Sequence, residues 1–123
     1  MHMILNGKTA VITGGSRGIG FTIAENFAKA GADLFLISRS QEELEKAKSK
    51  LASFPIKIEI YSADISNPKV ANDILRILNE KFGDKADILV NAAGIFGPIG
   101  PAIDNDLNEW RKVIDVNLIG TFL

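Results

Sequence analysis

Residues 13–20 read TGGSRGIG, and this stretch decides the fold. It follows the apolar residues 10–12 and opens a run with helical spacing. A strand that turns sharply into a helix leaves the first N–H groups of that helix unpaired, and these groups attract an anion together with the helix dipole. Glycine is needed where φ is positive, where backbone approaches a phosphate and where a helix packs closely on a strand. Gly14, Gly18 and Gly20 suit these three roles, although a glycine-rich turn without a ligand remains the simpler alternative.

Apolar runs alternate with helix-period runs along the rest of the chain. The pattern predicts strands over residues 9–13, 34–38, 56–61 and 88–90, and helices over 18–29, 41–52, 68–82 and 107–123. Residues 97–101 are expected to form a loop. This alternation predicts an α/β fold, a doubly wound parallel sheet with helices on both faces.

Local signals mark where the helices begin and end. Ser40 and Glu43 form a capping box, and Asn67 before Pro68 is a typical helix start. Gly31 and Gly83 follow the predicted ends of two helices. The expected apolar faces are Ile19, Ile23 and Phe27 in one helix, and Val70, Ile74, Leu78 and Phe82 in another. A solvated face is expected from Glu42, Glu43, Glu45, Lys46, Lys48 and Lys50.

Composition excludes several classes of function. The net charge of -1 over 123 residues gives no support for nucleic-acid binding or for a polybasic membrane contact. There is no cysteine, which fits a reducing compartment, and we expect a cytoplasmic protein. No apolar run approaches the roughly 20 residues that span a bilayer. No metal site is expected, and the one histidine, His2, lies at the terminus.

Four segments follow one another along the chain: the glycine loop at 13–20, Asp64, residues 91–94 and Asn117. Together they resemble the motifs of the short-chain dehydrogenase/reductase (SDR) family. The pattern Thr13-Gly14-x-x-x-Gly18-x-Gly20 resembles the family's T-G-x-x-x-G-x-G loop. Asp64 resembles the aspartate that contacts the adenine ring, and Asn91-Ala92-Ala93-Gly94 resembles the N-N-A-G motif, with alanine for the second asparagine. Asn117 resembles the family's helix asparagine. The resemblance covers the whole chain.

The resemblance implies a Rossmann-type, three-layer αβα fold that binds NAD(P). Residues 1–123 would be the N-terminal part of a single such domain, with its first four strands in the order 3-2-1-4. Asn117 is the implied catalytic residue. The implied cofactor-binding residues are Thr13, Gly14, Ser16, Arg17, Gly18, Ile19, Gly20, Ser38, Arg39, Asp64, Ile65, Asn91, Ala92, Ala93 and Gly94.

The residues after the second strand favour NADP over NAD. In Rossmann folds that bind NAD, an acidic residue about 20 positions beyond the glycine loop binds the ribose 2′-OH, whereas arginine accommodates a 2′-phosphate. Here Ser38 and Arg39 stand at that strand end, and Arg17 lies in the glycine loop. Two arginines would suit bidentate contact with a phosphate. The alternative is that both are solvated surface residues.

Asn117 is expected on the apolar face of the last helix. Trp110, Val113, Ile114 and Asn117 follow one another at i, i+3, i+4 and i+7. A buried amide needs hydrogen-bond partners, so this asparagine either ties down backbone in the core or does so while shaping the active site. The resemblance implies the second role, in which the asparagine holds a water of the proton relay.

The family's catalytic tyrosine is missing from this stretch of sequence. Carbonyl reduction needs an acid, and the family uses Tyr-x-x-x-Lys, whereas the only tyrosine here, Tyr61, is followed four residues on by Ile65. We therefore expect the chain to stop before the catalytic segment, and to show no turnover by itself.

The implied function is hydride transfer between NADP(H) and a ketone or secondary alcohol, with a 3-oxoacyl group on acyl carrier protein as one possible substrate. The alternatives are a non-catalytic nucleotide-binding module and a truncated product. A small-molecule substrate and a homo-oligomer, a dimer or tetramer, are the expected partners. The fourth strand would be an open edge, which invites self-association.

Overall fold

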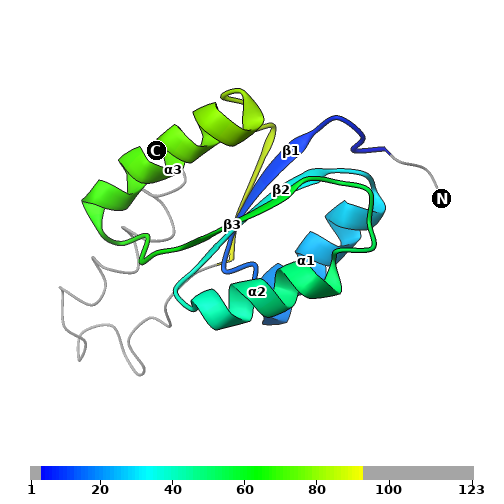
Figure 1. Ribbon diagram of the computed structural model, residues 1–123, viewed down its shortest axis with the longest axis horizontal. Helices are drawn as coiled ribbons and strands as arrows, with labels where there is room; N and C mark the ends of the chain where they lie inside the picture. The colour runs from blue at the N-terminus through cyan, green and yellow to red at the C-terminus, as the bar shows by residue number, and fades with distance from the viewer. Residues whose placement is uncertain (1–3, 93–123) are drawn as a thin grey trace, which may run out of the picture.

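A computed structural model describes residues 4–92 of the chain (Figure 1). Strands and helices alternate as predicted: β1 (Thr9–Thr13), α1 (Gly18–Lys29), β2 (Asp33–Ser38), α2 (Gln41–Lys50), β3 (Ile58–Ser62), α3 (Pro68–Phe82) and β4 (Ile88–Asn91). The predicted loop at 97–101 and the predicted helix at 107–123 lie outside the described residues. Within residues 4–92, none of the helices is long and apolar enough to cross a membrane.

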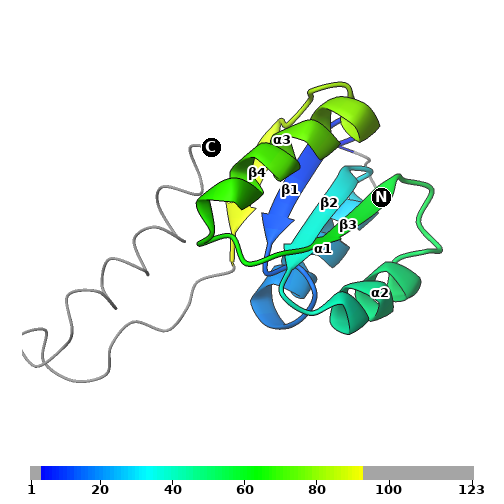
Figure 2. The same cartoon turned by 60° about the vertical axis from the view of Figure 1, so that its left-hand side comes forward.

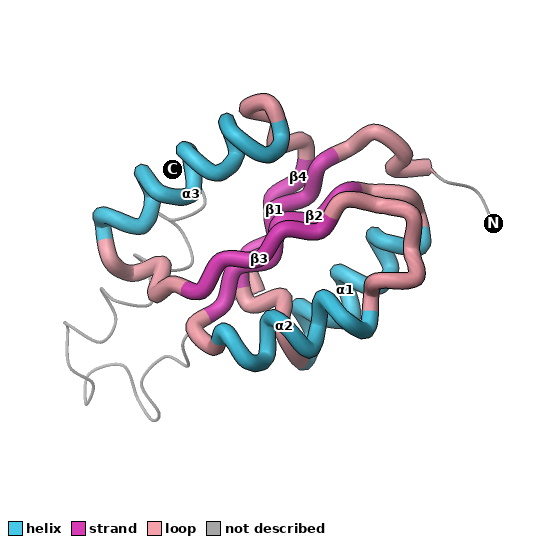
Figure 3. Tube along the Cα trace, in the orientation of Figure 1, coloured by secondary structure: helices cyan, strands magenta, loops and turns pink. Residues whose placement is uncertain are grey.

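The four strands form one parallel sheet in the order β3-β2-β1-β4, which confirms the predicted order. Figure 2 shows them side by side and running in the same direction. Helices α1 and α2 cover one face of the sheet and α3 covers the other (Figure 3), so the predicted three-layer arrangement is confirmed. Within the described part of the chain β4 pairs only with β1, and self-association through this strand stays a prediction.

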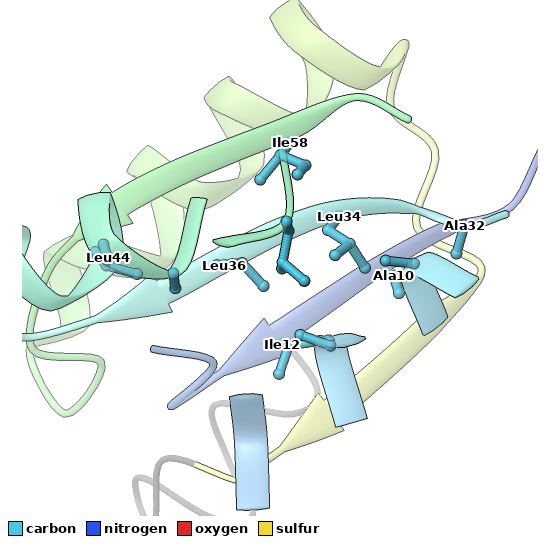
Figure 4. Packing of buried hydrophobic residues seen from close by; sticks show 11 residues of the cluster. Ala10, Ile12, Ala32, Leu34, Leu36, Leu44 and Ile58 are labelled. Carbon is cyan, nitrogen blue, oxygen red and sulfur yellow. The ribbon is translucent and has the colours of Figure 1, made fainter. Parts of the chain in front are cut away.

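Alternate residues of the two central strands, β1 and β2, enter two separate apolar clusters. Ala10 and Ile12 of β1, with Leu34 and Leu36 of β2, face α1 and α2 (Figure 4). Phe35 instead faces α3, where its ring stacks on Phe82 with centroids 5.8 Å apart. Both strands therefore bury both faces, as expected for the centre of a parallel sheet.

Helix α1 faces the sheet with smaller residues than the sequence analysis expected. Its buried residues are Gly20, Ala24 and Ala28, whereas Ile19 is 77% exposed, so the prediction for Ile19 was wrong. Ile23 and Phe27 are only partly buried and pack at the flank of the same cluster. The reason is close packing: a large side chain on the central stripe would push the helix away from β1.

The predicted bounds of α1 and α3 and the predicted start of α2 are confirmed, whereas α2 ends at Lys50, two residues before the predicted end. The Ser40 hydroxyl accepts a hydrogen bond from the Glu43 N–H (3.2 Å), and the Asn67 side chain accepts one from the Lys69 N–H (3.0 Å). Gly83 ends α3 in the left-handed region, at φ 61°. The strand expected over 56–61 begins two residues later, at Ile58, where pairing with Leu34 of β2 starts.

Leu34 and Leu75 offer a matched test of the core. Leu34 is fully buried, whereas Leu75 on α3 is 44% exposed. We expect Leu34→Ala to lower the free energy of unfolding by about 2–5 kcal/mol, through lost transfer energy and a residual cavity. Leu75→Ala should lower it by less than about 1 kcal/mol. Denaturant titration followed by circular dichroism measures both, and equal effects would contradict the described core.

Asp87, the residue before β4, links the start of β4 to the amino end of β1 through two hydrogen bonds. Its carboxylate accepts a hydrogen bond from the Thr9 N–H (2.9 Å), and its own N–H donates to the Thr9 carbonyl (2.9 Å). The backbone hydrogen bond from Thr9, and to a lesser degree the nearby Lys85, hold the pKa of Asp87 below its usual range. Folding therefore favours the ionised form of Asp87. The ionised carboxylate stabilises the folded protein at pH values above the pKa that Asp87 has in the unfolded state.

The stabilisation by Asp87 should therefore disappear in acid. It is lost as pH falls from about 4, the unfolded-state value, through the lower folded-state pKa. Asp87→Asn should flatten the fall of stability in that window. Asp84→Asn, which removes the same charge three residues earlier, is the control. Unfolding measured between pH 2 and pH 6 checks this, and identical pH slopes for wild type and Asp87→Asn would refute it.

Candidate cofactor-binding site

The carboxyl ends of the four strands meet at one edge of the sheet. Thr13 of β1 pairs in register with Asn91 of β4, and Ser38 of β2 pairs with Ser62 of β3. Polar side chains thus lie at the ends of the buried strands β1 and β2 and of the flanking strands β3 and β4. Open α/β sheets bind ligands at this edge.

The loop after β1 depends on glycine at three positions. Gly14 and Gly18 have φ values of 72° and 60°, which other residues rarely adopt. A Cβ atom on Gly20 would lie 2.0 Å from the Gly14 carbonyl oxygen, so only glycine lets α1 approach the loop this closely. A Cβ on Gly18 would meet nothing within 4 Å, which leaves space beside the backbone there. These values fit the conformational and packing roles predicted for the triplet.

The start of α1 is open to an anion. Arg17 is the N-cap residue, and its side chain makes no capping hydrogen bond. The first turn contains no acidic residue. The unpaired N–H groups and the positive end of the helix dipole are therefore not neutralised by a carboxylate of that turn.

A polar cluster, Ser16, Arg17, Ser38 and Glu43, joins this loop to β2 and α2. Ser16 Oγ donates to Ser38 Oγ at 2.9 Å, and the Glu43 carboxylate lies 3.4 Å from the same Ser16 oxygen. Arg17 Nη1 lies 3.5 Å from Glu43 Oε1, in a pair whose side chains are 81% and 37% exposed. An ion pair this exposed contributes only about 0.2–1 kcal/mol to stability and can exchange partners readily.

Arg39 follows directly on β2. Its residue is exposed, and its carbonyl oxygen accepts a hydrogen bond from Ser62 Oγ (3.0 Å), which fixes the backbone at this corner. The described residues hold no carboxylate in an ion pair with its guanidinium, whereas Arg17 is paired with Glu43. The two predicted arginines thus border the same edge of the sheet, one in the loop and one after β2.

Thr13 and Asn91 link the two middle strands. The Thr13 hydroxyl donates to the Asn91 side-chain oxygen (3.0 Å) and to the Val90 carbonyl (3.3 Å). The Ala92 N–H donates to the Thr13 carbonyl (3.1 Å). Because the Thr13 side chain is buried, its hydroxyl acts here to hold the end of β4 next to the glycine loop.

Asp64 lies in a tight turn after β3. Its carboxylate accepts hydrogen bonds from the Ser66 N–H (3.0 Å) and hydroxyl (2.7 Å). Its residue is exposed at the edge of the sheet, whereas the Ile65 side chain packs against the cluster under α3.

Three predicted site residues, Ala93, Gly94 and Asn117, lie outside the described residues. The other thirteen cofactor-binding candidates lie at the end of β1, in the glycine loop and start of α1, or at and just after the ends of β2, β3 and β4, along one side of the sheet. In residues 4–92 there is no group of three potential metal ligands. The Tyr61 hydroxyl donates to Asp73 of α3 (3.0 Å), and burial, with this hydrogen bond, raises the pKa of Tyr61.

The sequence analysis missed two residues of the site. A Cβ on Gly15 would lie 2.9 Å from the Leu36 side chain, so this glycine also keeps the loop close to the sheet. Glu43 was expected on a solvated helix face, but its carboxylate contacts the loop residues Ser16 and Arg17, and that prediction was wrong. The spacing of Ser40 and Glu43 indicated a cap, and it gave no sign of the contact to the loop.

Gly20→Ala tests the close approach of α1. We expect it to lower the free energy of unfolding by about 1–3 kcal/mol, because the loop must shift to admit the methyl group. A shifted loop should also weaken nucleotide binding. Gly83→Ala, which strains a backbone remote from the loop, is the control and should lower stability without affecting nucleotide binding. Calorimetric binding and thermal unfolding measure both, and undiminished nucleotide binding by Gly20→Ala would contradict the role of the loop.

The order of the strands and the position of the glycine loop define a Rossmann-type α/β fold. Residues 8–123 match the family model for short chain dehydrogenases, and the chain belongs to that family. It is 40% identical over 119 residues to a "probable NADP-dependent mannitol dehydrogenase" of Yarrowia lipolytica, and 36% identical over 122 residues to a sorbose reductase of Candida albicans. Each alignment covers 96% of this chain and 42% of the relative, so the chain spans less than half the length of these proteins.

A solved structure agrees with this assignment. The L-sorbose reductase of Gluconobacter frateurii, in complex with NADPH and L-sorbose, superposes with a TM-score of 0.88 at 33% identity, over 99% of this chain and 46% of that one. The predicted family and fold are therefore confirmed. The predicted cofactor, NADP, agrees with these proteins. The Yarrowia lipolytica relative is named as NADP-dependent, and the Gluconobacter frateurii structure contains NADPH.

Proposed function

We propose that this chain is the cofactor-binding part of an NADP(H)-dependent oxidoreductase that interconverts a ketone and a secondary alcohol. The observation that carries the proposal is the open start of α1 beside a loop in which Gly14, Gly18 and Gly20 have defined conformational and packing roles. Membership in the short chain dehydrogenase family supplies the reaction class. When bound, the nicotinamide supplies or accepts the hydride.

The residues present fit this cofactor at both of its charged groups. The N–H groups at the start of α1 would hold the pyrophosphate, and Gly18 leaves room for it beside the backbone. Ser38 and Arg39, with Ser16 and Arg17 across from them, would hold the 2′-phosphate. No carboxylate stands at the end of β2, where an NAD-binding fold needs one.

The remaining candidates would contact the other parts of the cofactor. Asp64 would contact the adenine, as the family resemblance implies, and Ile65 would lie beside it. Asn91, Ala92, Ala93 and Gly94 would lie along the nicotinamide half, with Thr13 holding Asn91 in place. Asn117 remains the proposed catalytic residue of this chain, as the holder of a relay water.

We also propose that residues 1–123 form the N-terminal part of a single domain whose acid lies elsewhere in the full-length protein. Tyr61 is unsuited to protonate a substrate, because its hydroxyl is committed to Asp73 and burial raises its pKa. Polyol and ketose pairs are the first substrates to test, since two relatives are named as a mannitol dehydrogenase and a sorbose reductase. A 3-oxoacyl thioester is the second. A cytoplasmic location and a homo-oligomer stay predictions from the sequence.

The experiment compares cofactor affinity in the full-length protein and in Arg39→Gln. Loss of a charge-assisted hydrogen bond weakens the binding free energy by about 1.5–3 kcal/mol. We therefore expect NADPH to bind about ten- to a hundredfold more weakly to Arg39→Gln. NADH affinity should stay unchanged, because NADH lacks the 2′-phosphate. Arg76→Gln, an arginine of α3 paired with Asp73, is the matched control. Equal losses for NADPH and NADH would contradict the assignment of Arg39.

Activity assays separate the enzyme from its alternative. The full-length protein should oxidise NADPH with a ketone substrate, and the polypeptide of residues 1–123 should not. NADPH binding by the full-length protein without turnover of ketoses, polyols or oxoacyl thioesters would favour the non-catalytic nucleotide-binding module. Turnover by residues 1–123 alone would refute the proposed division of the domain.

A further inference from the structure

The edge where the proposed function places the 2′-phosphate already holds a negative charge. The Glu43 carboxylate lies 3.4 Å from Ser16 Oγ and 3.5 Å from Arg17 Nη1. Ser16 in turn is hydrogen-bonded to Ser38 at the end of β2. We infer that Glu43 is a specificity-determining residue. Its carboxylate is the counter-ion of Arg17, competes with the 2′-phosphate for this arginine and so lowers the preference of the protein for NADP over NAD. This inference rests on the proposed function.

The carboxylate of Glu43 is not needed to begin the helix. The cap of α2 is made by the Ser40 hydroxyl and the Glu43 N–H, and neither group involves the Glu43 side chain. The neighbouring acids of the helix point to partners on the helix itself, Glu42 to Lys46 (3.4 Å) and Glu45 to Gln41 (3.2 Å). Glu43 is thus the acid of the first turns of α2 that reaches the glycine loop, and its contacts there need another explanation.

Charge gives that explanation. A phosphate ester carries about −1.5 to −2 charges at pH 7. If it binds beside Ser16 and Ser38, Arg17 must exchange the carboxylate for the phosphate, and the freed carboxylate then faces a like charge. The exposure of the Arg17–Glu43 pair makes the exchange possible, while the repulsion weakens binding of the phosphorylated cofactor only.

Before the cofactor binds, the ion pair with Glu43 holds the Arg17 side chain toward α2. A ligand without a 2′-phosphate leaves the Arg17–Glu43 pair undisturbed. Its affinity should therefore not depend on the charge of Glu43. A merely structural role for Glu43 would instead affect both ligands equally, because both need the glycine loop in the same conformation.

The test uses the full-length protein and the substitution Glu43→Gln. Glutamine keeps the length of the side chain and an oxygen that accepts from Ser16, and it removes the charge. We expect NADP⁺ to bind about three- to tenfold more tightly, and NAD⁺ to bind with wild-type affinity, as measured by calorimetry at low salt. In about 1 M salt, where the Debye length is about 3 Å, the gain should shrink to less than twofold.

Two further variants complete the experiment. Glu42→Gln removes the same charge one residue earlier, from a side chain paired with Lys46, and should change neither affinity by more than about twofold. Glu43→Asp keeps the charge and should behave like the wild type. Thermal unfolding of each variant verifies the fold.

The outcomes separate the inference from the proposed function. Tighter NADP⁺ binding by Glu43→Gln alone, lost at high salt, supports the inference. Unchanged binding, equal changes for NADP⁺ and NAD⁺, or the same gain in Glu42→Gln overturns it and leaves the proposed function intact. A wild-type protein that binds no NADP⁺ overturns the proposed function, and the inference with it.

Discussion

The structure depends on the close contact between the start of α1 and the loop that precedes it. Gly20 lies so near the Gly14 carbonyl that a single methyl group would not fit. This contact sets the distance of the whole helix from β1, and Ala24 and Ala28 continue the narrow spacing along the buried stripe. Because the helix is held close and starts directly after the loop, its N-terminus lies at the carboxyl edge of the sheet, where an anion can reach it.

Hydrogen bonds then connect this loop to both neighbouring strands. On one side Ser16 meets Ser38 of β2, and on the other Thr13 meets Asn91 of β4. The two contacts make three strand ends one unit, so that the groups proposed to bind the two halves of a dinucleotide keep a fixed separation. The buried strands beneath them supply the rigidity that such a site requires.

Much of this arrangement could be predicted from the sequence, because the signals were local. Glycines at fixed offsets, a serine cap at Ser40 and the Asn67-Pro68 start each act within a few residues, and their effect survives in the fold. The topology followed from the family resemblance. The exposure of Ile19 could not be predicted from periodicity, since it depends on how closely a neighbouring layer approaches. Nor could the contact of Glu43 with Ser16, which are 27 residues apart and meet only through tertiary packing.

The division between buried sheet and exposed rim has an evolutionary consequence. Arg17 and Arg39, which would distinguish one cofactor from the other, stand in solvent, whereas the residues that hold the fold are buried beneath them. Exposed substitutions away from packing usually change stability by no more than about 0.5 kcal/mol. A lineage with this architecture can therefore change its preference between NADP and NAD through a few substitutions of exposed residues at the sheet edge, without first accumulating stabilising changes in the core. Cofactor preference should consequently diverge faster among descendants than the sheet that carries it.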